Sequence, residues 1–108
     1  MLSIHFERIR ENYRKERRRE RERQRQWKAF IQTEGPRYAV VNWITGGRGG
    51  IRLWVEVETD RLDTALAYRS LARAEHPPSE RANAVILYDR VAGRALSIVG
   101  GVPVGGVG

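Results

Sequence analysis

Arginine side chains recur at intervals of three and four residues near the start of the chain. Because an α-helix has about 3.6 residues per turn, these side chains would form one stripe about 22 Å long. A guanidinium group can bind two phosphate oxygens at once, so the stripe suits a nucleic-acid backbone or an acidic protein surface. The candidate phosphate contacts are Arg10, Arg14, Arg18, Arg21 and Arg25, with Arg17 beside them.

A glycine-rich segment offers a second candidate contact. Residues 46–50 read Gly-Gly-Arg-Gly-Gly, and Arg48 and Arg52 would extend a basic surface if the helix lay nearby. The segment lacks the Lys-Ser/Thr ending and the following helix of a phosphate-binding loop. A flexible hairpin loop therefore explains it better than an RNA contact does.

Trp43 and Trp54 have two interpretations. They could be platforms on which unpaired bases stack, with Arg52 alongside. They could instead form an apolar surface that receives Trp27, Phe30 and Ile31 when the N-terminal helix docks on the sheet. We favour docking, because it explains both apolar surfaces together.

The chain offers little for catalysis. It has no cysteine, and its two histidines, His5 and His76, belong to no cluster with metal-ligand spacing, so we expect both on the surface. Asp60 and Asp63 fit the start of a helix, where the dipole favours negative charge. We therefore predict no catalytic residue, no metal and no cofactor, and a protein that is not an enzyme.

The formal net charge of +7 lies in one segment. Between Arg8 and Lys28 there are eleven basic and four acidic residues, and the rest of the chain is balanced. An Arg/Glu-rich run is also typical of a solvated spacer helix. The excess of positive charge favours nucleic-acid binding slightly over that alternative.

The basic segment is expected to be one helix, since no Gly or Pro occurs in residues 1–34 and good helix formers dominate. Glu–Arg pairs three residues apart, such as Glu20–Arg23 and Glu22–Arg25, would support it. Apolar residues in one helical phase occur at both of its ends, separated by charged residues. With the two strand tryptophans, the candidate partner or docking residues are Phe6, Ile9, Tyr13, Trp27, Phe30, Trp43 and Trp54.

A small domain follows the helix. We expect a hairpin with strands at residues 38–44 and 51–58, a helix from Arg61 to Ala74 capped by Thr59 or Asp60, and a second hairpin with strands at residues 84–88 and 95–99. Pairing of Ile44 with Ile51 would place both tryptophans on the face opposite the core. The core face would then carry Tyr38, Val40, Ile44, Ile51, Leu53, Val55 and Val57.

These elements predict an α+β fold. A long basic N-terminal helix precedes a small four-stranded, mainly antiparallel sheet, built as hairpin-helix-hairpin with one helix packed on it. The expected divisions are residues 1–34 for the basic amphipathic helix, 35–99 for the ββαββ domain and 100–108 for an irregular glycine-rich tail.

Two function classes remain. The first is a noncatalytic accessory protein that binds RNA or DNA through the arginine helix. The second is a protein-interaction module, such as a phage or mobile-element inhibitor or assembly factor, that grips an acidic or nucleic-acid-facing surface of a larger complex. The apolar ends of the helix support the second class and also allow self-association.

The closing hairpin and the lack of targeting signals add to this interpretation. The turn is similar to strand-turn-strand segments in small proteins of phages and mobile elements, which implies an accessory role; its residues are Tyr88, Asp89, Arg90, Gly93 and Arg94. No apolar run is long enough to span a bilayer, so we expect no membrane partner. We predict a cytoplasmic protein.

Overall fold

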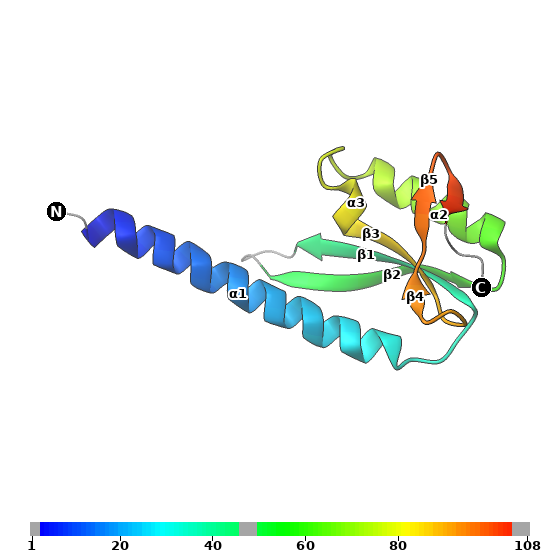
Figure 1. The fold of residues 1–108 in the computed structure, drawn as a ribbon, viewed down its shortest axis with the longest axis horizontal. Helices are drawn as coiled ribbons and strands as arrows, with labels where there is room; N and C mark the ends of the chain where they lie inside the picture. The colour runs from blue at the N-terminus through cyan, green and yellow to red at the C-terminus, as the bar shows by residue number, and fades with distance from the viewer. Residues whose placement is uncertain (1–2, 46–49, 105–108) are drawn as a thin grey trace.

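The structure, a computed structural model, describes residues 3–45 and 50–104 (Figure 1). In chain order its helices and strands are α1 (Ser3–Ile31), β1 (Tyr38–Thr45), β2 (Ile51–Thr59), α2 (Leu62–Ala74), α3 (Arg81–Ala84), β3 (Val85–Asp89), β4 (Arg94–Ala95), β5 (Ser97–Val99) and β6 (Val102–Val104).

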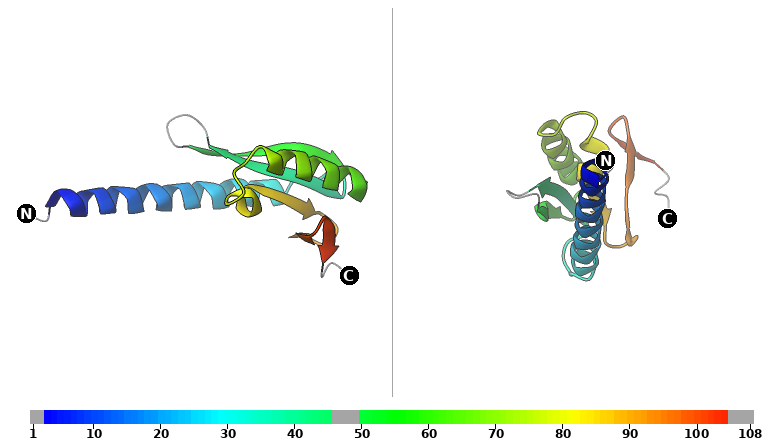
Figure 2. Two further views of the ribbon diagram at one scale, coloured as in Figure 1. Left: turned by 90° about the horizontal axis from the view of Figure 1, so that it is seen from above. Right: turned by 90° about the vertical axis from the view of Figure 1, so that its left-hand side faces the viewer.

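The predicted α+β fold is confirmed. Four antiparallel strands form a sheet in the order β2-β1-β3-β4, and β5 pairs with β6 in a separate hairpin. Helix α2 covers one face of the sheet, and the C-terminal part of α1 covers the other. The N-terminal part of α1 extends far beyond the sheet, which gives the molecule its elongated shape of 58 × 28 × 26 Å (Figure 2).

Each face of the sheet has its own apolar cluster because β1 is buried on both sides. Val40 and Leu87 pack against Ala65 and Ala72 of α2. On the opposite face, Val41 packs with Phe30 of α1. The central strand therefore joins two layers, and a change in either layer reaches the other through it.

The register of the first hairpin differs from the predicted one by one residue. Ile44 pairs with Arg52 rather than with Ile51, and the ladder shifts between Val40 and Val41. Because Val40 lies opposite Val57 and Val41 lies opposite Val55, Glu56 is an extra residue, as in a β-bulge. Loop length and bulges set register, and alternation of apolar residues alone does not reveal either.

This register separates the two tryptophans. Trp43 pairs with Leu53, whose side chain contributes to the cluster under α1. Trp54 pairs with Asn42, and successive strand residues point to opposite faces, so Trp54 lies on the α2 side. The prediction that both tryptophans share the face opposite the core is therefore wrong.

The start of α2 also differs from expectation. The helix begins at Leu62, and its N-cap residue Arg61 makes no side-chain capping bond. Asp60 Oδ1 instead accepts the N–H of Arg37 at 2.8 Å, and Thr59 Oγ1 accepts the N–H of Arg61 at 3.1 Å. The carboxylate that would have capped the helix thus fixes the chain just after α1.

The second hairpin is shorter than predicted and a third one follows it. Leu96 donates its N–H to Leu87 O at 2.8 Å, after which β5 leaves the sheet and pairs with β6. Gly100 and Gly101 have φ values of 58° and 77°, which suits the tight two-residue turn between these strands. The expected irregular tail is therefore wrong for Val102–Val104.

Candidate nucleic-acid interface

The last turns of α1 are held on the sheet by an aromatic cluster. Phe30 is buried, with 7% of its surface exposed. Its ring lies 5.5 Å from that of Trp27 and 5.7 Å from that of Tyr88, and Trp27 meets Tyr88 edge-on at 5.4 Å. Edge-to-face and tilted rings at these distances add to the burial of apolar area. The C-terminal part of α1 thus docks on the sheet, but Trp27 and Phe30 pack on Ala39, Val41 and Tyr88, whereas Trp54 lies on the other face and Ile31 is exposed.

Gln26 ties the same part of the helix to the free edge of β2. Its Nε2 donates to Ile51 O at 2.8 Å, and its Oε1 accepts the N–H of Leu53 at 2.7 Å. The side-chain amide of Gln26 thus makes the two hydrogen bonds that the backbone of a neighbouring strand would make at this edge. An outer strand that would otherwise present unpaired backbone is covered by the helix.

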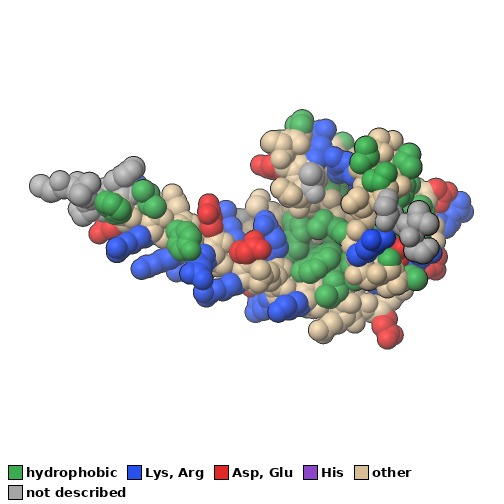
Figure 3. Space-filling view, viewed as in Figure 1, with side chains coloured by type: hydrophobic (Ala, Val, Ile, Leu, Met, Phe, Trp, Pro, Cys, Tyr) green, Lys and Arg blue, Asp and Glu red, His purple; other side chains and the backbone are tan. Residues whose placement is uncertain are grey.

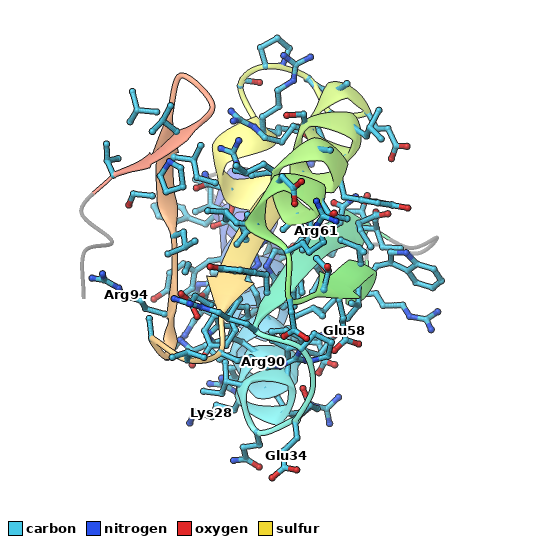
Figure 4. All side chains as sticks on the ribbon, turned by 90° about the vertical axis from the view of Figure 1, so that its right-hand side faces the viewer. Lys28, Glu34, Glu58, Arg61, Arg90 and Arg94 are labelled. Atoms are coloured by element: carbon cyan, nitrogen blue, oxygen red, sulfur yellow. The ribbon has the colours of Figure 1, made fainter. Side chains whose placement is uncertain are left out.

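Arg90 fixes the chain that leaves α1. Its Nη1 lies 2.8 Å from both Pro36 O and Glu58 Oε2, and its guanidinium stacks 5.4 Å over the ring of Phe30 (Figure 4). A Cβ atom on Gly35 would lie only 2.8 Å from the same Nη1. Glycine at this position therefore allows the close approach of Arg90 to the backbone.

Asp89, next to Arg90, is a buried carboxylate with a complete set of donors. It accepts bonds from Arg37 Nε and Nη2, at 3.2 and 3.1 Å, and from the N–H groups of Val91 and Ala92. Burial works against its ionised form, but these hydrogen bonds outweigh burial and lower the pKa of Asp89. Arg37 thereby joins the segment after α1 to the end of β3.

The other end of α1 lies away from the sheet. Every residue from Phe6 to Arg21 is exposed, a length of about 24 Å at 1.5 Å per residue. Exposed apolar side chains lie along this stretch at Phe6, Ile9 and Tyr13. We call residues 6–21 the projecting segment and residues 22–31 the docked segment.

The arginine stripe points away from the domain. Side chains advance by about 100° per helical residue, so the stripe lies between roughly 100° and 180° around the axis from Trp27, which faces the sheet. The space-filling view shows basic side chains along the side of α1 that is turned away from the domain (Figure 3). Phe6, Ile9 and Tyr13 lie within about 60° of the direction of Trp27, so the apolar stripe lies toward the sheet side.

The predicted phosphate contacts differ in their partners. Arg25 is bonded to Glu22 at 2.6 Å, and this bond, followed by that from Gln26, lowers the pKa of Glu22. Arg17 stacks 5.6 Å over Tyr13. In the part of the chain that the structure describes, four arginines of the stripe make no ion pair: Arg10, Arg14, Arg18 and Arg21.

Several of these side chains are brought together on the helix surface. A shallow hollow of about 280 Å³ is lined by Tyr13, Arg14, Arg17, Arg18 and Arg21. The guanidinium groups around it belong to neighbouring turns of one helix and face solvent. They can donate hydrogen bonds to successive oxygen atoms of an extended anionic chain.

Two other predicted contacts are not brought to the stripe. Arg48 lies outside the described residues. Arg52 pairs with Ile44, so its side chain lies on the face of the sheet opposite α1. Its guanidinium lies 5.8 Å from the centre of the exposed ring of Trp54. Trp43 is covered, with 7% of its surface exposed and Arg23 5.8 Å over its ring. Trp43 thus has no free face on which a base could stack.

His76 is a residue whose setting the sequence did not reveal. Its Nε2 lies 2.7 Å from Oδ1 of the buried Asn42, whose Nδ2 donates to Glu56 Oε1 at 3.0 Å. His76 is half-buried beside a hollow that Arg23 and Trp43 also line, so it lies at the surface but is less exposed than expected. A polar Asn in the middle of an apolar strand was the available signal.

Within residues 3–45 and 50–104, no group of three or more His, Asp or Glu side chains could hold a metal ion. None of the helices that the structure describes has the length and apolar character needed to cross a membrane. A comparison of the chain with protein-family models, curated proteins and solved structures finds no match.

Proposed function

We propose that the protein is a noncatalytic accessory protein that binds nucleic acid through the projecting segment of α1. One observation carries this proposal: a helix that is fixed at one end presents Arg10, Arg14, Arg18 and Arg21 to solvent without intramolecular acidic partners among the described residues. Phosphate oxygens would replace water around these groups. Binding of this kind depends on backbone charge and has no strong sequence preference.

The docked segment supports the proposal by holding the arginine stripe in place. Gln26 bonds the end of the helix to the edge of β2, and Phe30 packs against the sheet with Arg90 over its ring. A binding surface that is already ordered loses less conformational freedom when a partner arrives. The stripe also lies on the open side of α1, so the domain leaves room for a duplex or an extended strand.

The test is binding to labelled random-sequence duplex DNA, duplex RNA and single-stranded RNA across a salt series. For about five neutralised phosphates, the log-log salt slope should lie near −4. Replacement of Arg10, Arg14, Arg18, Arg21 and Arg25 by Gln should abolish binding and leave the circular dichroism spectrum of the domain unchanged. Retained affinity in that variant would contradict the proposal.

A matched control separates the stripe from overall charge. Arg14→Gln with Arg18→Gln removes two charges from the stripe, and Arg61→Gln with Arg94→Gln removes two from the domain. The first pair should weaken binding at least about tenfold, as expected for the loss of two charge-assisted contacts. It should also reduce the magnitude of the salt slope by about 2. Equal losses in the two variants would point to net charge instead of the stripe.

A protein partner is the second candidate function. It is favoured by the exposed side chains Phe6, Ile9 and Tyr13, which lie beside the arginines on the projecting segment. A groove-binding amphipathic helix uses apolar anchors with this spacing. If none of the three nucleic acids binds at low salt, this candidate takes precedence, and light scattering at two concentrations tests whether the partner is a second copy of the chain.

A further inference from the structure

The sheet has an open groove at the edge of β3, far from the arginine stripe. Strand β4 pairs with Tyr88 and Asp89, Leu96 adds one bond to Leu87 O, and β5 then turns away to pair with β6. The space between α2, β3 and β5 measures about 340 Å³ and is lined mainly by Val85, Leu87, Leu96, Ile98, Arg69 and Arg73. Apolar side chains are exposed at this open side of the sheet, near the β5–β6 hairpin (Figure 3).

The backbone at this edge can accept another strand. Leu87 O receives the N–H of Leu96, so Leu87 directs its backbone groups toward the outer side of β3. By the alternation of a strand, the N–H of Leu87 and the C=O of Val85 point the same way. Within the described residues no strand pairs with Val85 or Ile86 on this side.

Two arginines define the charge of the groove. Arg69 and Arg73 lie one turn apart on α2, and both are half-buried. Neither has an acidic partner among the residues that the structure describes, and Arg73 Nε is buried without a hydrogen-bond partner. Burial, together with the charge of Arg73, lowers the pKa of Arg69. An anion placed here would relieve the repulsion and supply the missing acceptor.

We infer that this groove binds an extended acidic segment of a partner protein, which adds to the edge of β3 as a further strand. A carboxylate of the segment would bind Arg69 and Arg73. The backbone of the segment would accept the N–H of Leu87 and donate to the C=O of Val85. An apolar side chain two residues from the carboxylate, on the same face of the segment, would fit beside Leu96 and Ile98. Strand addition with pockets for alternate side chains is an established mode of peptide recognition.

This inference goes beyond nucleic-acid binding and stands on different residues. Arg69 and Arg73 belong to α2, on the opposite face of the sheet from α1. A protein with both sites would connect a nucleic acid on the helix to a partner on the domain. Either site can fail without the other.

The first test uses the full ¹⁵N-labelled chain and a capped octapeptide in which Glu and Val alternate at every second position with Thr between them, so that Glu and Val lie on one face of the strand. Binding should shift the amide signal of Leu87 and slow its hydrogen exchange. The peptide with Gln in place of Glu should bind at least about tenfold more weakly, because charge-assisted hydrogen bonds are lost. Arg73→Gln should weaken binding of the Glu peptide by a similar factor. Equal affinity of the two peptides would overturn the inference.

The basic helix needs a control, because acidic peptides are attracted to it by charge alone. The titration is repeated in a chain with Arg10→Gln, Arg14→Gln and Arg18→Gln, where the shift at Leu87 should persist. Shifts confined to residues of α1 in the unmodified chain would contradict the groove. These outcomes are independent of whether the helix binds nucleic acid.

Steric blocking provides a matched pair of variants. Ser97 lines the groove, so Ser97→Trp should fill it and abolish the shift at Leu87. Val102 is exposed on β6 and lies outside the groove lining, so Val102→Trp should leave the affinity unchanged. The amide spectra without peptide verify that both variants keep the fold. Unchanged binding in folded Ser97→Trp would overturn the inference.

Discussion

The two segments of α1 differ in their surroundings although they form one continuous helix. The docked segment is fixed by Gln26, Trp27 and Phe30, which contact the edge and the face of the sheet. Every residue of the projecting segment, residues 6–21, is exposed. The same apolar phase thus contributes to the core at one end and lies exposed at Phe6, Ile9 and Tyr13 at the other.

The difference shows that anchoring and binding use separate residues. An isolated helix of about 16 residues is marginal in water, but helix propagation from a fixed turn avoids the cost of nucleation. The docked segment supplies that fixed turn, and the predicted pairs Glu20–Arg23 and Glu22–Arg25 are present at 3.4 and 2.6 Å near the junction. Substitutions should therefore affect stability in the docked segment and binding in the projecting one.

The largest expected contrast is between two phenylalanines of this helix. Phe30→Ala should lower the free energy of unfolding by about 3 kcal/mol, because it removes a buried ring from the cluster with Trp27 and Tyr88. Phe6→Ala removes the same side chain from a solvent-exposed site and should change stability by less than about 0.5 kcal/mol. Urea unfolding followed by circular dichroism measures both, and equal losses would show that the projecting segment is packed in solution.

A smaller loss is expected at the junction between the helix and the sheet. Asp89→Asn should cost about 2 kcal/mol, since a buried acceptor of four hydrogen bonds loses its charge opposite Arg37. The pKa of Asp89 lies below its ordinary value of 3.8, so its ionisation stabilises the fold above about pH 4 and this contribution disappears as the pH falls further. The stability difference between wild type and Asp89→Asn should therefore shrink below pH 4.

Asp63→Asn is the control for this junction. Asp63 is exposed and paired with Arg61 at 2.8 Å, and the bond from Arg61 lowers its pKa as well. Solvent screens this pair, so above about pH 4 its removal should cost less than that of Asp89. A larger loss in Asp63→Asn would mean that Asp89 does not fix the end of the helix.

Much of the fold follows from the sequence because its signals are local. The long helix is set by the absence of Gly and Pro before Gly35, and the first hairpin by two β-rich runs around a glycine loop. The bulge at Glu56 and the divergence of β5 depend on contacts between distant segments. Gly100–Gly101 was a local turn signal for the last hairpin, but composition suggested an irregular tail instead.

The candidate site was predictable only in part for the same reason. Helical spacing placed Arg10, Arg14 and Arg18 on one side, and it also placed Trp27 and Phe30 on another. It could not show that this second side meets the sheet while the arginine side stays open. Likewise, Arg69 and Arg73 line a groove whose shape depends on where β5 leaves the sheet, which no periodicity in the sequence records.

The next contrast compares two glutamines that lie two residues apart on α1 and so point to opposite sides of the helix. Gln26→Ala should cost about 1 kcal/mol, because Ile51 O and the N–H of Leu53 lose their partner at the edge of β2. Gln24 is exposed, so Gln24→Ala should leave stability nearly unchanged. Hydrogen exchange at Leu53 gives a local readout. Faster exchange in Gln26→Ala alone is expected, whereas faster exchange in both would indicate general fraying of α1.

The smallest expected effect on stability belongs to the arginine stripe. Arg14→Gln with Arg18→Gln should change the free energy of unfolding by less than about 0.5 kcal/mol, because neither side chain has an ion-pair partner among the described residues and Gln is also a good helix former. Urea unfolding at low and high salt measures this. Relief of repulsion between neighbouring arginines would make the variant slightly more stable at low salt. A loss above 1 kcal/mol would instead place these arginines in the fold, and the separation of anchoring from binding along α1 would no longer hold.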